Sequence, residues 1–230
     1  MSKPYDEMDK ESVLEYAKQL EGKTLRELLS EETIENMKRE EGGNKGRYGQ
    51  KIEKYYFGYE LNSDTSADFA CGLELKATPL KRLKNGNLSP KERLVCNIIN
   101  YETIIDETWE SSSFLEKNAE ILLLRYIDPM DKSVNQLDYQ IVDVQIHRIF
   151  DNLEDKKQFE ADWNFIVNKI KSGQAHNLSE GDTKFLGACT KGSTALKSLR
   201  SQPNSSEPAK QRAFSFKTQY MRELLRRLGI

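Results

Sequence analysis

Three short apolar segments constrain the fold of this chain more than any other feature. They are rich in leucine, isoleucine and valine, which indicates core strands: Leu94–Ile99, Ala119–Tyr126 and Tyr139–Ile146. A fourth segment, Leu73–Thr78, alternates apolar and polar residues as a strand does. The dipeptide Asn85-Gly86 then predicts a tight turn between two strand-like flanks.

Helical patterns lie on both sides of these strands. Glu11–Leu20 has apolar residues at helical spacing, and Thr24 with Glu27 forms a capping-box pattern at the start of a second helix. Lys45–Tyr56 also favours a helix. Residues 1–150 are therefore predicted to form an α/β lobe.

Residues 151–230 have a different character and predict a second, mainly helical lobe. Thr218–Leu228 is a basic helix that ends the chain, and short helices and a loop are expected before it, around Thr183–Leu186 and Ala195–Leu199 and over Gln202–Pro208. Leu153–Lys171 is a strongly amphipathic helix, with an apolar face expected to contain Leu153, Phe159, Trp163, Ile166 and Ile170. The fold class is α/β, with a mixed β-sheet flanked by helices.

Composition excludes several classes of protein. The chain of 230 residues is 37% hydrophobic and 31% charged, which is typical of a globular protein. No segment approaches the roughly 20 apolar residues of a membrane span, so no membrane partner is expected. Three widely spaced cysteines fit a reducing compartment, and we expect a cytoplasmic protein. With only two histidines, a Cys/His zinc finger is excluded.

Charge is distributed unevenly along the chain. Lys184–Ile230 contains ten Lys or Arg and two acids, a balance of +8, whereas the remaining residues carry −10. Such asymmetry suggests a basic face that meets a polyanion. The alternative is an ordinary solvated helix surface, because charge alone supplies affinity for phosphates and no chemistry.

The segment Ala67–Pro79 carries the groups most suited to catalysis. If Leu73–Thr78 is a strand, Glu74 and Lys76 project from the same face, because side chains repeat every two residues. Asp68 precedes this strand, and a turn at Gly72 would fold it back beside Glu74.

Two carboxylates placed in this way can hold Mg²⁺, which prefers a few carboxylates with water and phosphate oxygens. A lysine beside them can orient or deprotonate an attacking water and stabilise developing negative charge. The set suits metal-assisted hydrolysis of a phosphodiester. The alternative is a strand with one charged, exposed face, since so short a pattern also arises by chance.

Several separate blocks, in the same order and with similar spacing, resemble the MutH-type endonucleases. This family comprises GATC-nicking mismatch-repair enzymes and the Sau branch of type II restriction endonucleases, which cut at GATC; the Sau branch is the closer of the two. The blocks span nearly the whole chain: Lys45-Gly46, Gly49, Ile52-Glu53, Asp68–Ala70, Gly72–Lys76, Lys91–Glu102, Ser111–Lys117, Leu178–Gly181, Cys189–Gly192 and Lys210–Lys217.

The resemblance implies a restriction-endonuclease-like, PD-(D/E)xK core with two lobes around a DNA-binding cleft. It makes Asp68 and Glu74 the metal ligands, with Mg²⁺ as cofactor, and Lys76 the catalytic lysine. It adds further catalytic residues, an acid near the metal and two bases near the scissile phosphate: Glu53, Lys45 and Lys117.

On the DNA side, the resemblance makes Lys191 a reader of base edges in the major groove, which suits an amine that can reach guanine O6 and N7. The expected DNA-binding set also contains Thr190, Arg212, Ser215 and Lys217. The implied partners are double-stranded DNA containing GATC, a cognate DNA methyltransferase, and a second copy or dimer partner on the palindromic site. The restriction relatives are longer, so the chain would correspond to their catalytic N-terminal domain.

Three departures from the family pattern leave alternatives open. Asp68 and Glu74 are separated by five residues, one fewer than is usual in the family, so the loop either tightens or degrades the metal site. Cys189 replaces an arginine, and Ser215 replaces a tyrosine that senses adenine methylation in MutH. We therefore expect a restriction enzyme indifferent to adenine methylation. The alternatives are a mismatch-repair nickase of hemimethylated GATC and a non-catalytic DNA-binding effector domain.

Overall fold

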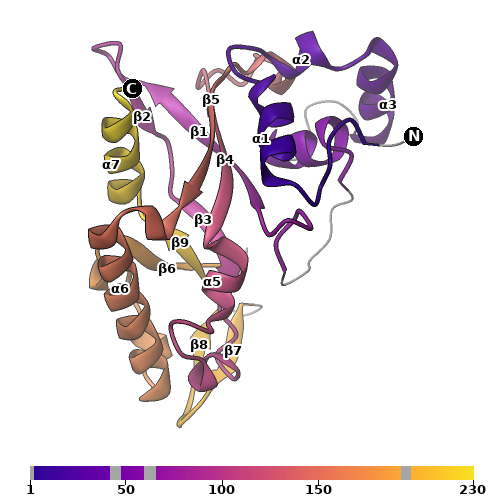
Figure 1. Ribbon diagram of the computed structural model, residues 1–230. Coiled ribbons are helices and arrows are strands. Elements are labelled where there is room, and N and C mark those ends of the chain that lie inside the picture. The colour runs from indigo at the N-terminus through magenta and orange to yellow at the C-terminus, as the bar shows by residue number, and fades with distance from the viewer. Residues whose placement is uncertain (1–2, 42–47, 60–65, 193–197) are drawn as a thin grey trace. The chain divides into compact units, whose positions relative to one another are not determined.

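The computed structural model describes residues 3–41, 48–59, 66–192 and 198–230, and its chain folds into two compact units (Figure 1). The first unit comprises Met1–Glu92 and Glu120–His147, with Ile230. The second comprises Arg93–Ala119 and Arg148–Gly229. The two units interleave in the sequence. The predicted boundary at residue 150 placed Arg93–Ala119 in the first lobe, whereas this segment groups with the C-terminal residues.

The first unit is built on a four-stranded sheet of order β2-β1-β4-β5. Strand β1 (Glu74–Arg82) pairs in parallel with β4 (Glu120–Ile127), and β2 (Leu88–Pro90) pairs antiparallel with β1. Strand β5 (Ile141–Arg148) lies on the far side of β4. The expected turn at Asn85-Gly86 joins β1 to β2, with Gly86 at φ +88°.

Short helices cover the apolar face of this sheet. Helix α2 begins with the expected capping box, in which Thr24 accepts from the Glu27 N–H and Glu27 accepts from the Thr24 N–H. Leu75, Leu122 and Leu124 pack here with Val13 and Ile52 of the helices. The helices and 3₁₀ turn of this unit are α1 (Lys10–Lys18), α2 (Leu25–Leu28), α3 (Glu31–Glu41), α4 (Tyr48–Lys51), the π-helix η1 (Ile52–Tyr56) and η3 (Gln136–Asp138).

The second unit contains a three-stranded antiparallel sheet of order β3-β9-β6. Its strands are β3 (Leu94–Ile98), β6 (Leu186–Thr190) and β9 (Arg212–Phe216). A separate hairpin is formed by β7 (Leu199–Gln202) and β8 (Ser205–Lys210).

Among its described residues, the second unit also contains the α-helices α5 (Ser113–Asn118), α6 (Leu153–Lys171) and α7 (Thr218–Leu228). Helix α6 packs on β6, and an aromatic cluster of Phe114, Phe159, Phe214, Phe216 and Tyr220 fills the core between the helices and the sheet. The 3₁₀ turns are η2 (Ile104–Asp106), η4 (Ile149–Asp151), η5 (Ala175–Asn177) and η6 (Glu180–Asp182). Among the described helices, none has the length and apolar character to cross a membrane.

The expected strands around residues 73–146 and the helices α1, α6 and α7 are confirmed. The short helix predicted at Thr183–Leu186 is wrong, because Leu186 begins β6. The predicted loop Gln202–Pro208 contains the end of β7, the turn of the hairpin and most of β8. The helix predicted at Ala195–Leu199 falls partly outside the described residues, and its last residue begins β7. A mixture of strands and helices therefore replaces the expected mainly helical part.

The prediction that Leu153 belongs to the core is also wrong. Leu153 is 62% exposed, whereas Phe159, Trp163, Ile166 and Ile170 are buried as predicted. At about 100° per residue, Leu153 lies roughly 80° around the helix from Trp163, outside the buried stripe.

Candidate active site

An acid and a lysine stand side by side at the start of β1. The side chains of Glu74 and Lys76 are 1% and 21% exposed, and Lys76 Nζ forms an ion pair with Glu74 Oε1. Both project from the face of the sheet opposite Leu75, which belongs to the apolar core. The structure therefore brings these two predicted residues into direct contact.

Asp68 is folded back onto the same strand by a tight turn. Within the turn, the Gly72 N–H donates to Phe69 O at 2.8 Å and the Phe69 N–H donates to Leu73 O at 3.0 Å. Gly72 has φ +87°, a conformation that favours glycine. The Asp68 carboxylate then accepts from the backbone N–H of Leu75 with Oδ2, at 2.8 Å. The shortened connection between Asp68 and Glu74 thus closes as a regular turn.

Glu53 lies in the π-helix η1, and the helical segment that contains it packs on β1. Gly49 makes this approach close: a Cβ at Gly49 would lie 3.5 Å from Ala77 Cβ and 3.9 Å from Glu53 Oε1. Ala77 is the residue after Lys76, on the opposite face of the strand. Glu53 therefore belongs to an element fixed against the strand of Glu74 and Lys76, and its catalytic role stays a prediction.

The two predicted bases have different positions. Lys45 lies outside the described residues. Lys117 belongs to the second unit, where it is half-buried in helix α5. This helix is fixed by the fully buried Asn118, whose Nδ2 donates to Phe114 O at 2.9 Å and to Asn97 Oδ1 at 3.0 Å.

The donor chemistry at the start of β1 fits a hard cation. Asp68 and Glu74 supply carboxylate oxygens, and Mg²⁺ is commonly bound by one or two carboxylates together with water and substrate phosphates. In the part of the chain that the structure describes, no group of three or more His, Cys, Asp or Glu side chains could hold a metal ion. If Asp68 and Glu74 hold such an ion, water and substrate would have to supply its remaining ligands.

In the second unit, Thr190 and Lys191 lie where β6 ends. Thr190 is exposed and Lys191 is half-buried, and the Lys191 N–H donates to Gln211 O at 2.8 Å. The following residue, Gly192, has φ +109°, and a Cβ there would lie 2.6 Å from Ser198 Cβ. Only glycine fits this position, which directly follows Lys191.

The other residues assigned to DNA contact the protein itself. Arg212 is 9% exposed and donates to the carbonyl oxygens of Ala188 and Leu178. Lys217 Nζ donates to the carbonyl oxygens of Glu180 and Thr183. Ser215 is 1% exposed in the middle strand of the sheet. Contact of these three side chains with DNA stays a prediction.

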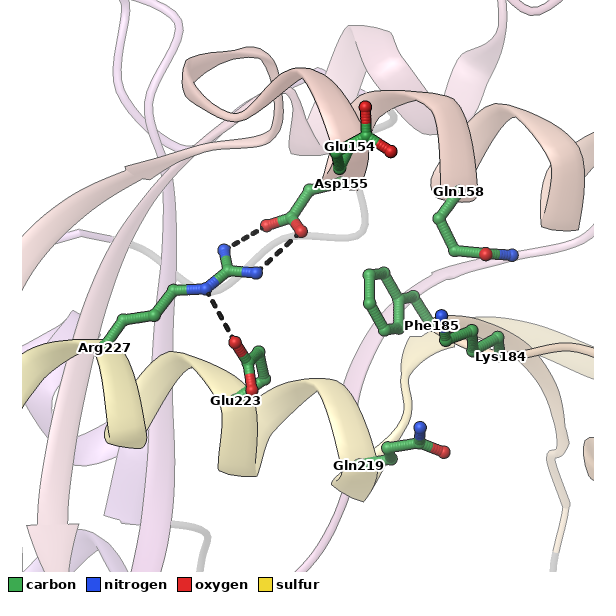
Figure 2. A pocket seen from close by; sticks show the side chains of 8 residues that line it. All are labelled: Glu154, Asp155, Gln158, Lys184, Phe185, Gln219, Glu223 and Arg227. Carbon is green, nitrogen blue, oxygen red and sulfur yellow. Dashed lines mark hydrogen bonds and ion pairs between the residues drawn. The ribbon is translucent and has the colours of Figure 1, made fainter.

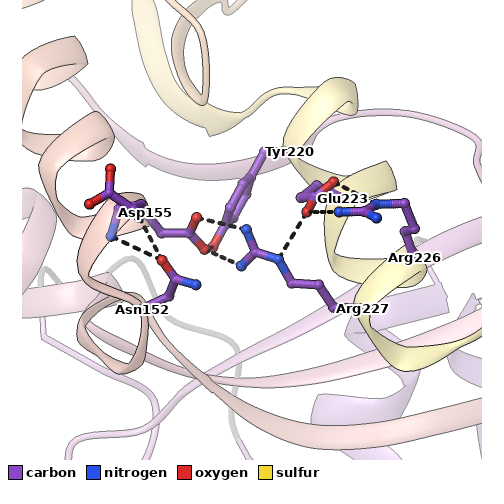
Figure 3. Close-up of polar contacts among 7 residues, drawn as sticks. Asn152, Asp155, Tyr220, Glu223, Arg226 and Arg227 are labelled. Atoms are coloured by element: carbon purple, nitrogen blue, oxygen red, sulfur yellow. Dashed lines mark hydrogen bonds and ion pairs between the residues drawn. The ribbon is translucent and has the colours of Figure 1, made fainter.

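A polar cluster that sequence reasoning missed joins α6 to α7 (Figure 3). Asp155 is 2% exposed and accepts from both terminal nitrogens of Arg227, at 2.5 and 2.8 Å, and from the Tyr220 hydroxyl at 3.0 Å. Arg227 Nε donates to Glu223 at 3.1 Å. The only signal in the sequence is weak: Glu223 and Arg227 are four residues apart on a predicted helix.

These contacts shift the ionisation of the cluster. The hydrogen bond to Asp155 raises the pKa of the Arg227 guanidinium. Hydrogen bonds from Arg226 and then Arg227 lower the pKa of the Glu223 carboxyl to about 2. A hollow of about 360 Å³ lies beside the cluster, and Lys184, Phe185 and Gln219 form its opposite wall (Figure 2). Arg227 of α7 is paired with Asp155 of α6 and with Glu223 of its own helix. The cluster therefore links α6 to α7.

Comparison with known proteins finds a matching family model and a similar enzyme. Residues 57–162 match the family model described as DNA mismatch repair enzyme MutH. Over 223 residues, 96% of this chain, the sequence is 42% identical to the type II restriction enzyme Sau3AI of Staphylococcus aureus. The chain spans 43% of the length of that enzyme. The segment matched by the family model includes Asp68, Glu74, Lys76 and Lys117.

Proposed function

Since the chain belongs to the MutH/Sau3AI-type family, we propose that it is a Mg²⁺-dependent, type II restriction endonuclease that hydrolyses DNA at GATC. The observation that carries this proposal is the contact of Glu74 with Lys76 and the return of Asp68 to the same strand. Acidic oxygens can hold the metal that assists phosphodiester hydrolysis, and an amine beside them can stabilise the negative charge that develops.

Asp68 and Glu74 would hold the ion. When bound, Mg²⁺ would neutralise the scissile phosphate and activate a water. Lys76 Nζ would orient that water and stabilise the negative charge that develops on the phosphate. Glu53 would support the metal site, and Lys45 and Lys117 would approach the scissile phosphate.

We propose that the fold has a PD-(D/E)xK core and two lobes around a DNA-binding cleft. Lys191 and Thr190 would read base edges, with Arg212, Ser215 and Lys217 at or behind the same surface. Because GATC is palindromic, cutting of both strands would require a second copy on the DNA or two successive nicks. A cognate methyltransferase and a cytoplasmic location belong to the same proposal.

Cleavage of plasmid DNA tests the proposed function. We expect Mg²⁺-dependent cuts at GATC in a plasmid that contains this sequence, and no cuts in a matched plasmid in which every GATC is altered. End mapping then gives the position of the cut. Binding to GATC without cleavage under all metal conditions would instead support a DNA-binding effector domain.

The match to the MutH model supports a second candidate, a mismatch-repair nickase of hemimethylated GATC. The identity with a restriction enzyme over 96% of the chain favours the first candidate. The two candidates differ in their product. A nickase leaves one strand intact and is stimulated by a MutL-type partner, whereas a restriction enzyme cuts both strands without one.

A further inference from the structure

Three charged side chains hold the segment that leads into β6. The first is Arg212 of β9, which donates to Ala188 O at 2.8 Å and also to Leu178 O. These two carbonyl groups lie ten residues apart in the sequence. One guanidinium therefore ties the start of the segment to the strand at its end.

The second side chain is Lys217, which follows β9. Its Nζ donates to Glu180 O at 2.6 Å and to Thr183 O. These carbonyl groups lie at the first residue of the 3₁₀ turn η6 and just after its end, so the lysine connects both ends of the turn. Two of the three ammonium protons are therefore used on backbone carbonyls. A Cβ at Gly187 would lie 3.2 Å from Lys217 Cγ, so the lysine stem lies directly over β6.

The third side chain is Asp162 of α6, which is 4% exposed. Its carboxylate accepts from three successive backbone N–H groups, those of Lys184, Phe185 and Leu186, at distances between 2.6 and 3.2 Å. A buried carboxylate with several N–H donors is well compensated for its desolvation. Arg212 and Lys217 thus bind the carbonyl groups of this segment, and Asp162 binds its N–H groups.

The position of this segment bears on DNA reading. Residues 178–186 lead directly into β6, and β6 ends at Thr190, next to Lys191. Arg212 is buried and Lys217 is half-buried. A cation removed from water is costly unless it is hydrogen-bonded, and both of these cations donate to backbone carbonyls whose positions they fix. Arg212 is 9% exposed and two of its nitrogens already donate to carbonyls, an arrangement poorly suited to a phosphate ligand.

We infer that Arg212 and Lys217 are positioning residues that set segment 178–190 so that Lys191 can read a base, and that they are not phosphate ligands. This inference rests on the proposed function. All basic residues of Lys184–Ile230 contribute to the positive charge of this region. By this inference, Arg212 and Lys217 contribute to DNA recognition by fixing the protein backbone, whereas other basic residues contact the DNA.

Salt dependence of DNA binding distinguishes the two roles. Each phosphate contact contributes about 0.9 to the slope of log K against log salt concentration. Binding is measured in the Lys76→Ala background with Mg²⁺, on duplexes with and without GATC. For Arg212→Met and Lys217→Met, we expect the salt slope to stay unchanged and the preference for GATC to fall at least about 10-fold, as a lost base contact would cause.

Two further variants serve as references. Lys191→Ala should also reduce the preference for GATC. Arg222→Met makes the same chemical change at an exposed arginine of α7 and should leave the preference unchanged. A slope reduced by about 0.9 with an unchanged preference for GATC in Arg212→Met would overturn the inference and make Arg212 a phosphate ligand.

Amide hydrogen exchange of the free protein tests the inference independently of DNA. In Arg212→Met and Lys217→Met, we expect faster exchange over residues 184–191 and unchanged exchange in the central turns of α6. Equal exchange over residues 184–191 would contradict the inference. If Arg212→Met does not fold, Arg212→Lys keeps the charge and can reach only one carbonyl, so it should show the same changes at smaller amplitude. Should the wild-type protein bind DNA without any preference for GATC, the proposed function fails, while the exchange result still decides whether these residues position β6.

Discussion

The Oδ2 atom of Asp68 accepts a hydrogen bond from the backbone N–H of Leu75 at 2.8 Å. Asp68 is therefore tied to the residue that lies between Glu74 and Lys76. A hydrogen-bond acceptor at this position stabilises the turn, whereas a negative charge is needed only if the side chain holds a cation. The two contributions can be separated by substitution.

Asp68→Asn keeps an oxygen for the Leu75 N–H and removes the charge. We expect the thermal unfolding midpoint to stay within a few degrees of the wild type, and kcat for Mg²⁺-dependent cleavage to fall at least about 100-fold. Asp68→Ala loses the acceptor too, so its free energy of unfolding should fall by about 1 kcal/mol more. Cleavage by Asp68→Asn at the wild-type rate would remove Asp68 from the metal site.

Lys76→Ala should abolish cleavage and leave DNA affinity nearly unchanged, because Lys76 is proposed to act in the transition state. Lys81→Ala is a matched control, since Lys81 lies on the same strand and is likewise half-buried. Single-turnover cleavage and equilibrium binding measure the two effects separately. A large loss of affinity in Lys76→Ala, with cleavage preserved at saturating protein, would contradict this role.

Ser215 lies in β9, paired with Gly187 of β6 and Val95 of β3. Since a serine occupies less space than the tyrosine of MutH, we expect equal cleavage of adenine-methylated and unmethylated GATC duplexes. Cleavage of both substrates under the same conditions, with hemimethylated DNA as a third, provides the measurement. A strict block by methylation would reject the expectation.

The link between α6 and α7 should contribute strongly to stability. Arg227→Met leaves the buried Asp155 carboxylate without its cation, and breaking such a pair costs about 3 kcal/mol or more. Arg226→Met is the control, because the Arg226 side chain is 75% exposed and pairs only with Glu223 among the described residues. Its effect on the free energy of unfolding should be much smaller than that of Arg227→Met, since exposed ion pairs contribute little. Urea unfolding of the two variants gives both values.

Local patterns in the sequence were sufficient for much of the first unit. The alternation around Glu74 and Lys76 predicted the strand and its charged face, and Gly72 predicted the turn that returns Asp68 to it. Each of these follows from neighbouring residues, because strand period and turn chemistry are local properties.

The second unit depended on contacts that no local pattern reveals. Leu186–Thr190 contains Gly187 and Ala188, which have little strand preference. It forms β6 because β9 pairs with it and because Asp162 accepts from N–H groups at its start, those of Phe185 and Leu186. The role of Arg212 was hidden for the same reason: a basic residue looks alike in sequence whether it meets a phosphate or a buried carbonyl.

The pH dependence of stability follows from Glu223. Its pKa in the folded protein is lowered from 4.5 to about 2, mainly by the hydrogen bond from Arg226. A carboxyl with a lowered pKa stabilises the folded state fully above its unfolded-state pKa, and this contribution is lost as pH falls from about 4.5 towards 2.

Glu223→Gln should therefore reduce the dependence of the thermal unfolding midpoint on pH within this window and should lower the midpoint at pH 7. Because the carboxylate is near the surface, 1 M NaCl should diminish the difference between the two proteins. An identical pH profile for Glu223→Gln and the wild type at low salt would show that the Glu223–Arg226 and Glu223–Arg227 contacts do not stabilise the fold.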